Sequence, residues 1–498
     1  MKRLFSFKDS IFHFPAALVS FLLLIPLVLF LTQIKGLSWA EDLEFLSVIG
    51  WTFFQALAAT GLIFLFSFLG VRGLLTLVSK KYYFLIEAFV VLPSLIPSLI
   101  LVISVANLLE LFMPFPFGLG SLIFFQVLTY TGLCSVVWSR VLSEEISQLS
   151  EWAYIHDLSS WKFLKYIMRT FLRKDIKTLM TLIFISAFTS LSLPLLTAGG
   201  RGVSLEFFIY EQLKDPDAWP VATFLILLQT VLIFYIYIKA FSPTLSSSFN
   251  FYKGKIYLIP KKIMLIIPLF PSLISVFGLF FISDFKKNFL KIIDLDFILW
   301  SSLLHSFLLG LGVGSLVLVF FIMMSLSFRS SIFRKFVVAF MYPGVTLVGF
   351  AFLILPFYSL NFVLLKWIFG LSLLLFPIVY RLRGEVMLEK LTDQVEMTRL
   401  LGGSWLFVFS KILWPQSRSV FFLCAGLSAF LACGDFSYSL IVSQGHWNMA
   451  LLTYDLFSSY RLDLALLASW FLLILSLLVF LFWIGVSFVF DKKFKLQH

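Results

Sequence analysis

The sequence predicts an all-α integral membrane protein with about twelve transmembrane helices in two homologous six-helix halves, and with both termini in the cytoplasm. Two observations predict this class. Of the 498 residues, 60% are hydrophobic and only 13% are charged, whereas soluble domains carry about 25% charged residues. The apolar residues also fall into runs of about 20, the length that crosses the hydrocarbon core of a bilayer as a helix. No polar stretch is long enough for a separate soluble domain of ordinary size.

Twelve apolar runs have the length of a membrane span. The first follows a basic N-terminus and resembles a signal peptide, with a weak cleavage-site pattern at Ser38 to Ala40. It is long enough to cross a bilayer, so we expect a retained helix. The spans expected in the first half are 14–34, 48–70, 83–108, 120–141, 178–197 and 219–240. Those expected in the second half are 263–283, 298–325, 335–358, 361–381, 419–441 and 464–489.

The loops between these spans alternate in charge. The basic segments are the N-terminus, 72–81, 162–177, the linker near residue 250 and the C-terminal tail, and the acidic ones are 41–44 and 206–217. Because Lys and Arg accumulate in cytoplasmic loops, this polarity predicts that both termini are cytoplasmic. The loop at 284–296 fits least well, since three Lys offset its three Asp. The net charge of +12 is then a property of cytoplasmic loops and indicates no nucleic-acid partner.

The chain also looks duplicated. Six spans, a basic linker and six further spans predict a first half at 1–245, a cytoplasmic linker at 246–262 and a second half at 263–498. Gly200 and Gly445 correspond at an offset of 245 and precede the last span of their halves. Weak internal repeats are common in transporters, so the pattern favours transport over a structural membrane role.

The segment near 384–418 is a polar exception among the second-half spans. Its first part suits a helix with one apolar and one charged side, which Gly402-Gly403 can end by adopting positive φ. Ser404 suits the N-cap of a second short helix, and Pro415 suits the first turn of the membrane helix that follows. The residues expected to share a face of the short helix are Trp405, Val408, Phe409 and Ile412. Two interpretations stay open on physical grounds: a helix–turn–helix that contacts a cytoplasmic partner, or an amphipathic loop on the membrane surface.

Four residues of this segment have a definite spacing. Gly402, Ile412 and Pro415 follow Glu396 by 6, 16 and 19 residues. This spacing resembles the EAA loop of bacterial binding-protein-dependent ABC importer permeases, in which E-A-A is followed by G and then by I-x-L-P. The departures from the pattern are Met397 and Thr398 for the two Ala, and Trp414 for the Leu.

A degenerate second copy of the loop lies in the first half, near 144–175. An offset of 245 leads to Glu151, Ala153, Asp157 and Ile167. Asp157 stands in place of the Gly and tolerates a left-handed turn better than most residues, whereas Thr170 stands where Pro is expected. Each copy lies between the fourth and fifth spans of its half.

The resemblance implies that these loops dock on two copies of a cytoplasmic ABC ATPase subunit, and that an external substrate-binding protein delivers the substrate. The residues it assigns to the coupling loops are Glu396, Gly402, Gly403, Ile412, Pro415, Glu151, Ala153, Asp157 and Ile167. The chain has no G-x-x-x-x-G-K-[ST] loop, and the Gly cluster at 199–202 has no Lys. We therefore expect no catalytic residue and no cofactor in this chain, with ATP and magnesium held by the partner ATPase.

Fused permeases with two six-span halves occur among those for thiamine and for ferric iron. The segments "AFTSLSLPLLTAGGRGVSLEFFIYEQL" and "GDFSYSLIVSQGHWNMALLTYDLFSSYR" resemble the thiamine permeases more closely, with Ser204 in place of their Thr. The resemblance therefore implies import of thiamine or a related compound, with ferric iron next, across a bacterial inner membrane.

Few polar side chains fall within the predicted spans. The notable ones are Glu87, His305, Lys366 and Asp435; such residues are functional candidates, and Asp435 is the best candidate for a role in the substrate pathway or in helix packing. Pro93, Pro97 and Pro343 lie in the third span of each half and suit bending or gating. No His, Cys or carboxylate cluster has metal-ligand spacing, and the three Cys form no C-x-x-C, so we expect no metal site.

Two other classes of function compete with the importer. An ion-coupled secondary transporter also often has six plus six helices, but it usually needs buried charged groups for coupling, and these are scarce here. A membrane enzyme or scaffold is the third class, and no Ser-His-Asp, H-E-x-x-H or paired-carboxylate pattern supports an enzyme. A neighbouring gene for an ATPase would separate the importer from both.

Overall fold

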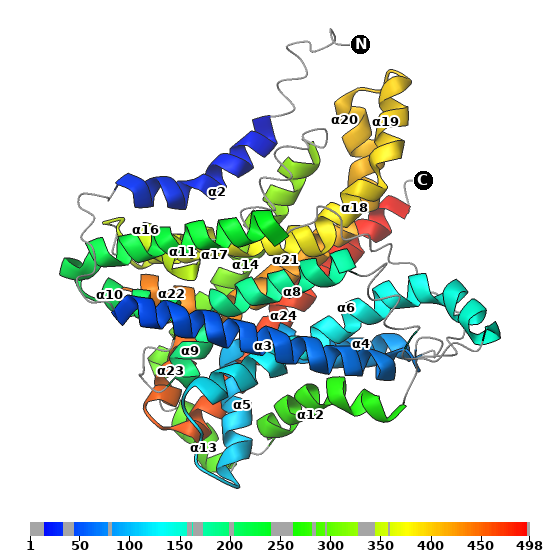
Figure 1. The fold of residues 1–498 in the computed structure, drawn as a ribbon. Coiled ribbons are helices and arrows are strands. Elements are labelled where there is room, and N and C mark those ends of the chain that lie inside the picture. Colours follow the sequence, from blue (N-terminus) through cyan, green and yellow to red (C-terminus); the bar gives the residue numbers. More distant parts are fainter. Residues whose placement is uncertain are drawn as a thin grey trace. The chain divides into compact units, whose positions relative to one another are not determined.

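The computed structural model describes residues 14–32, 44–77, 82–156, 162, 173–198, 204–240, 262–280, 285–293, 296–326, 344–356 and 359–495. These residues form helices and turns and no strand (Figure 1). The predicted all-helical class is therefore confirmed for the part of the chain that is described.

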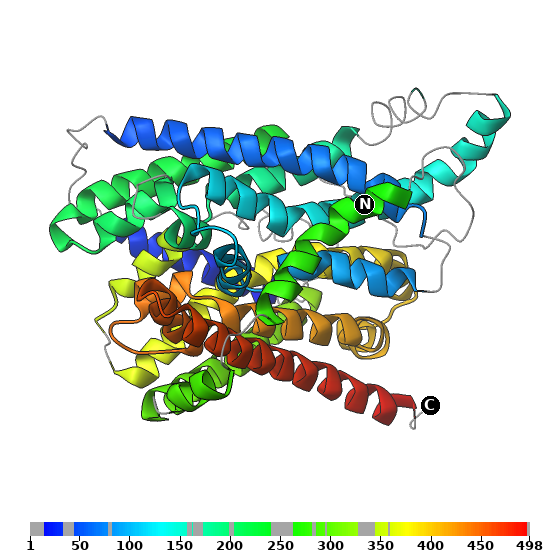
Figure 2. The ribbon, with the colours of Figure 1, turned by 90° about the horizontal axis from the view of Figure 1, so that it is seen from below.

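Among the described residues, eight helical segments are long and apolar enough to cross a membrane. They contain α3 (Glu44–Leu74), α6 (Leu119–Ile155), α11 (Trp219–Ala240), α12 (Ile266–Phe280), α14 (Asp296–Leu326), α17 (Leu360–Val379), α21 (Trp414–Gly434) and α24 (Leu462–Lys495). Figure 2 shows α24, in red, as one long unbroken helix. Shorter helices lie where other spans were predicted, namely α2 (Phe14–Thr32), α8 (Arg173–Phe188) and α16 (Val345–Leu353). The protein is a multi-pass helical membrane protein; the count of twelve spans and the side of each terminus stay predictions.

The predicted span at 83–108 is broken in two. Its parts are α4 (Tyr83–Leu95) and α5 (Ser98–Glu110), which meet at an angle of 96°. Ile96 and Pro97 between them have ψ values of 133° and 136°, which are extended. A residue before proline is disfavoured in the α region, and Pro97 has no N–H to donate, so the helix stops here. Pro93 lies inside α4 and is buried. Pro93 and Pro97 were predicted to suit bending of this span, and the bend lies at Ile96 and Pro97.

Residues 39–214 and 228–284 form one compact unit. Its core lies between α3, α6 and α8, where the buried residues include Ala59, Ile63, Cys134, Trp138 and Ile183. The helix α12 also packs in this unit against α3, α4, α5 and α6. Asn107 Nδ2 donates to the carbonyl of Gly278 at 3.0 Å and Ser272 Oγ to that of Phe89 at 2.6 Å, so polar bonds as well as apolar packing fix α12.

Residues 1–38, 215–227 and 285–498 form the other compact unit. Its core lies between α14, α21 and α24 and includes Phe422, Ala425, Ala429, Val479 and Trp483. The helix α2 packs in this unit against α14 and α16, with Phe30 and Phe350 in an edge-to-face contact at 6.0 Å. Each unit thus holds the first helix of the other predicted half: α12 lies with α3 to α6, and α2 lies with α14 and α16.

Elements of the two predicted halves correspond in length and capping. Both α3 and α14 have 31 residues, and both α9 (Ser192–Thr197) and α22 (Ser437–Val442) have six. The helices α10 (Leu205–Leu213) and α23 (Met449–Ser458) are capped alike, because Ser204 accepts the N–H of Phe207 and Asn448 accepts that of Leu451. The half boundaries at 245 and 263 stay a prediction.

Candidate functional site: two connecting segments and an ion pair

The polar segment after α17 continues that helix instead of leaving it as a loop. The π-helical turn η3 (Tyr380–Gly384), α18 (Glu385–Lys390) and α19 (Thr392–Leu400) follow in succession, with only Leu391 between the last two. The chain then reverses into α20 (Trp405–Val408). Figure 1 shows α19 and α20 side by side, projecting from the other helices of their unit. We call α19, the turn at 401–404 and α20 the coupling hairpin.

The turn of the coupling hairpin has the bonds of a Schellman motif. Gly402 has a φ of +87°, in the left-handed region that favours glycine. The N–H of Gly403 donates to the carbonyl of Thr398 at 3.0 Å, and that of Gly402 to the carbonyl of Arg399 at 3.0 Å. These two bonds satisfy carbonyls that the end of α19 leaves open. The prediction that Gly402-Gly403 ends the first helix is confirmed.

The second helix of the hairpin begins at a capped end. Ser404 is extended, and its Oγ accepts the N–H of Phe407 at 3.3 Å, as predicted for an N-cap. Pro415 is the second residue of α21 and lies in the first turn of that helix, as predicted, although no break precedes α21. Residues 405–434 form one continuous helix, with the π-helical turn η4 (Phe409–Leu413) immediately before α21. A wider turn accommodates the missing N–H and the bulk of the proline ring without a break.

The inner face of the coupling hairpin is packed. Val395 of α19 and Trp405 and Val408 of α20 are buried, whereas Phe409 and Ile412 of the predicted shared face are half-buried. Two side-chain contacts hold α19 in place. The Arg399 guanidinium carbon in α19 lies 4.9 Å from the centroid of the Trp405 ring in α20. Gln416 Nε2 in α21 donates to Gln394 Oε1 in α19 at 2.9 Å. The hairpin is therefore held by its own side chains, as a preformed element.

The outer face of the coupling hairpin is apolar and open. Five large apolar side chains at its tip are 50 to 88% exposed, and these are Met397, Leu400, Leu401, Leu406 and Phe407. Glu396, the first residue of the EAA-like spacing, is exposed beside them. Exposed apolar side chains of this kind mark a contact with another protein or with the membrane. The tip thus presents a carboxylate and an apolar patch on a rigid turn.

The first-half segment has a different form in the part that the structure describes. The helix α6 runs unbroken from Leu119 to Ile155, past the end of its apolar stretch at Arg140. Glu151 and Ala153 lie in its last turns, and Ile155 is 75% exposed. Asp157 and Ile167 lie outside the described residues, so their predicted role in a turn stays a prediction.

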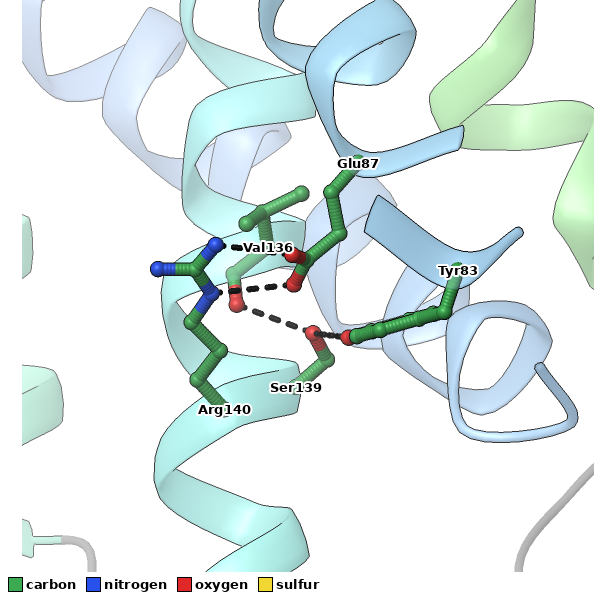
Figure 3. Close-up of polar contacts among 5 residues, drawn as sticks. All are labelled: Tyr83, Glu87, Val136, Ser139 and Arg140. Carbon is green, nitrogen blue, oxygen red and sulfur yellow. Dashed lines mark hydrogen bonds and ion pairs between the residues drawn. The ribbon is translucent and has the colours of Figure 1, made fainter. Parts of the chain in front are cut away.

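An ion pair that the sequence reasoning did not find joins α4 to α6. Arg140 donates from Nε to Glu87 Oε1 at 2.9 Å and from Nη2 to Glu87 Oε2 at 2.7 Å, a two-pronged contact (Figure 3). The Glu87 side chain is 2% exposed and that of Arg140 is 22% exposed. One turn away, the hydroxyls of Tyr83 and Ser139 lie 2.9 Å apart. Figure 3 shows that Glu87 and Tyr83 of α4 point toward Arg140 and Ser139 of α6.

Close packing of the two helices explains why these groups meet. A Cβ on Gly132 of α6 would lie 2.0 Å from the carbonyl oxygen of Val90 in α4, so only glycine allows this approach. Val90 lies three residues from Glu87 on α4. The sequence did hold a signal, since Glu87 and Arg140 sit at the same predicted edge of adjacent spans, but their separation of 53 residues hid the pairing.

The other polar residues singled out in the spans bind helix ends. Asp435 is half-buried; its Oδ2 accepts the N–H of Tyr438 and its Oδ1 the hydroxyl of Ser437, both at 3.0 Å. Tyr438 in turn donates to the carbonyl of Lys366 at 2.9 Å, and Lys366 Nζ donates to the carbonyl of Leu355 at 2.7 Å. Asp435 therefore caps the start of α22, and its predicted pathway role stays a prediction.

The remaining candidates divide by position. Pro97 marks the bend between α4 and α5, whereas Pro343 lies outside the described residues. His305 Nδ1 lies 2.9 Å from the carbonyl oxygen of Trp447. The residues that the structure describes contain no group of three or more His, Cys, Asp or Glu side chains suited to a metal ion.

Comparisons with protein-family models, with curated proteins and with solved structures find no match for this chain. Its class therefore rests on its own features: a multi-pass helical membrane protein with a preformed hairpin between two spans.

Proposed function

We propose that this chain is the membrane-spanning permease subunit of a binding-protein-dependent ABC importer, and that the coupling hairpin docks on a separate ATP-hydrolysing subunit. The observation that carries the proposal is the rigid turn with an open apolar tip. Gly402 with its positive φ and the exposed Glu396 occupy two of the positions that resemble the EAA loop, and Ser404 caps the helix that follows the turn.

The length of the second arm favours a protein partner over the membrane surface. The helix at 405–434 has 30 residues and is about 45 Å long, whereas the hydrocarbon core of a bilayer is about 30 Å thick. Its C-terminal part is buried within the unit, whereas Leu406 and Phe407 in its first turns are 71% and 50% exposed, so we infer that these first turns extend beyond the hydrocarbon core. The tip then lies where a cytoplasmic subunit can reach it.

The exposed apolar side chains and the closed turn of the tip favour binding to a partner. Leu400 and Leu401 are 85% and 88% exposed, and burying one such side chain contributes about 1.5–3 kcal/mol. Because the turn is already closed by hydrogen bonds and by the contact of Arg399 with Trp405, little ordering opposes association. An apolar, preformed contact of this kind can transmit a push from the partner to α21.

The remaining features of the proposal follow from the resemblance. A second ATPase copy engages the degenerate first-half segment, both termini are cytoplasmic, and ATP and magnesium stay on the ATPase subunits. An external binding protein delivers the substrate to the inner membrane of a bacterium. Thiamine or a related compound is the favoured substrate and ferric iron is next.

The proposal is tested by retention of an ABC ATPase subunit on the purified chain in lipid nanodiscs. We expect retention to fall at least tenfold for Glu396→Lys and for Gly402→Pro, because the first reverses a contact charge and the second closes off the left-handed turn. Leu401→Glu, which places a charge at a side chain that is 88% exposed in the chain, should have a similar effect.

Matched variants exclude a general loss of folding. Gly445 also has a φ of +87° and open space around its Cα, and Phe112 is 82% exposed in a loop of the other unit. Gly445→Pro and Phe112→Glu should retain the ATPase subunit like the wild type. Equal retention by Leu401→Glu and Phe112→Glu would remove the coupling hairpin from the interface.

A further inference from the structure

We propose that Glu87 and Arg140 form a latch that ties the projecting end of α6 to the bent α4–α5 pair, so that displacement of the first-half segment by the ATPase moves the bend. The inference deepens the proposed function and rests on it for the source of the displacement. It assigns a positioning role to two residues outside both EAA-like segments.

The helix α6 is continuous from its apolar stretch to its exposed end. It contains 37 residues without a proline or a break, and it joins its apolar stretch to the predicted first-half loop. From Arg140 to Ile155 it extends by 15 residues, or about 22 Å. A force on its exposed end at Ile155 and His156 is therefore carried along the helix axis to Arg140.

The helix α4 leads from the latch to a bend. Glu87 lies nine residues before Ile96, about 14 Å along the helix. Beyond the 96° bend, residues 99–106 of α5 are all buried. The backbone at Ile96 and Pro97 makes no continuous helix, so it is the point in α4–α5 that yields when α4 is moved.

The contact between Glu87 and Arg140 fixes the relative orientation of the two side chains as well as their separation. A guanidinium and a carboxylate joined by two parallel bonds hold a single relative orientation, and a nearly buried carboxylate resists loss of its partner. Close packing alone is already supplied by Gly132, eight residues before Arg140, and Val90, three residues after Glu87. The charged pair therefore adds a coupling that packing does not provide, and the bond between Tyr83 and Ser139 lies on the same side of it.

The latch is tested in the purified chain by the distance between spin labels at the start of α4 and at the end of α6. The labels are placed by Tyr82→Cys and His156→Cys, since both positions are exposed and the three native cysteines are buried. In lipid nanodiscs we expect one narrow distribution. Glu87→Gln should at least double its width, and Arg140→Lys, which keeps the charge but loses the two-pronged contact, should give an intermediate width.

Two further variants separate the latch from general destabilisation. The exchanged pair Glu87→Arg with Arg140→Glu should restore a narrow distribution. Glu211→Gln removes an ion pair of the same 2.7 Å length in the same unit, but that pair is exposed, so the width should not change. An unchanged width in both Glu87→Gln and Arg140→Lys would overturn the latch.

The outcome is distinguishable from failure of the proposed function. If the chain retains no ATPase subunit and Glu87→Gln still broadens the distribution, the importer assignment fails and the tie between the helices stands. If the subunit is retained and the width does not change, only the latch fails. With the subunit bound, ATP should shift the distance between labels at Leu111 and His156 in the wild type, and the shift should be lost in Glu87→Gln.

Discussion

The two segments that resemble coupling loops follow helices that are built and held in different ways. In the first half, α6 continues without a break to Ile155, and a charged pair fastens that helix to α4. The second-half segment is divided by the π turn η3, by Leu391, by the glycine turn and by the π turn η4. The helix α6 is held by an ion pair with α4, whereas the coupling hairpin is held by its own hydrogen bonds and side-chain contacts.

The difference is visible at corresponding positions. Arg140 lies 21 residues after the first residue of α6, and Arg381 lies 21 after that of α17. Arg140 pairs with Glu87, and Arg381 is buried in the π-helical turn η3. The predicted span at 335–358, which corresponds in the sequence to the span at 83–108, contains no Asp or Glu. The described residues thus show a Glu–Arg pair in the first half and a closed glycine turn in the second.

The largest expected effect concerns the first-half pair. Arg140→Gln leaves the nearly buried Glu87 carboxylate without its partner, and breaking a buried pair in this way costs about 3–5 kcal/mol. Glu87→Gln should cost less, because Arg140 is 22% exposed and its head can turn to the interface. Thermal unfolding in detergent should therefore place the midpoint of Arg140→Gln below that of Glu87→Gln, and both below that of the exposed control Glu211→Gln. The reverse order of the two pair variants would contradict this account of the burial.

A smaller effect is expected at the second-half turn. Ser404→Ala removes the oxygen that accepts the N–H of Phe407, which costs about 1 kcal/mol at an N-cap. The loss is local to the start of α20, so hydrogen exchange at residues 405–408 should rise by roughly fivefold. The amides of α6 serve as the internal control. Uniform acceleration throughout the chain would show that the hairpin is not an independent local element.

Local features of the fold could be predicted from the sequence, whereas contacts between residues far apart in the chain could not. Gly402 and Ser404 were predictable because a positive φ and an N-cap are set by neighbouring residues. Pro415 was placed correctly in the first turn of α21, but the continuity of α21 with η4 was not predicted, because a proline is compatible both with a helix start and with a wide turn inside a helix. The pairing of Glu87 with Arg140 depended on the approach of α4 to α6 at Gly132, and no local pattern encodes that approach. The amino-acid composition of the chain predicted the helical membrane class, whereas side-chain packing determines which helices lie together.

The central claim is that ATP hydrolysis on a separate subunit drives transport through this chain. The most direct test is uptake into liposomes that contain the chain and an ABC ATPase subunit, with an external binding protein and labelled thiamine or ferric iron. We expect uptake with ATP, none with a proton gradient alone, and a loss of at least tenfold for Gly402→Pro but not for Gly445→Pro. Uptake that proceeds on a proton gradient without ATP would contradict the account and assign the chain to the secondary transporters.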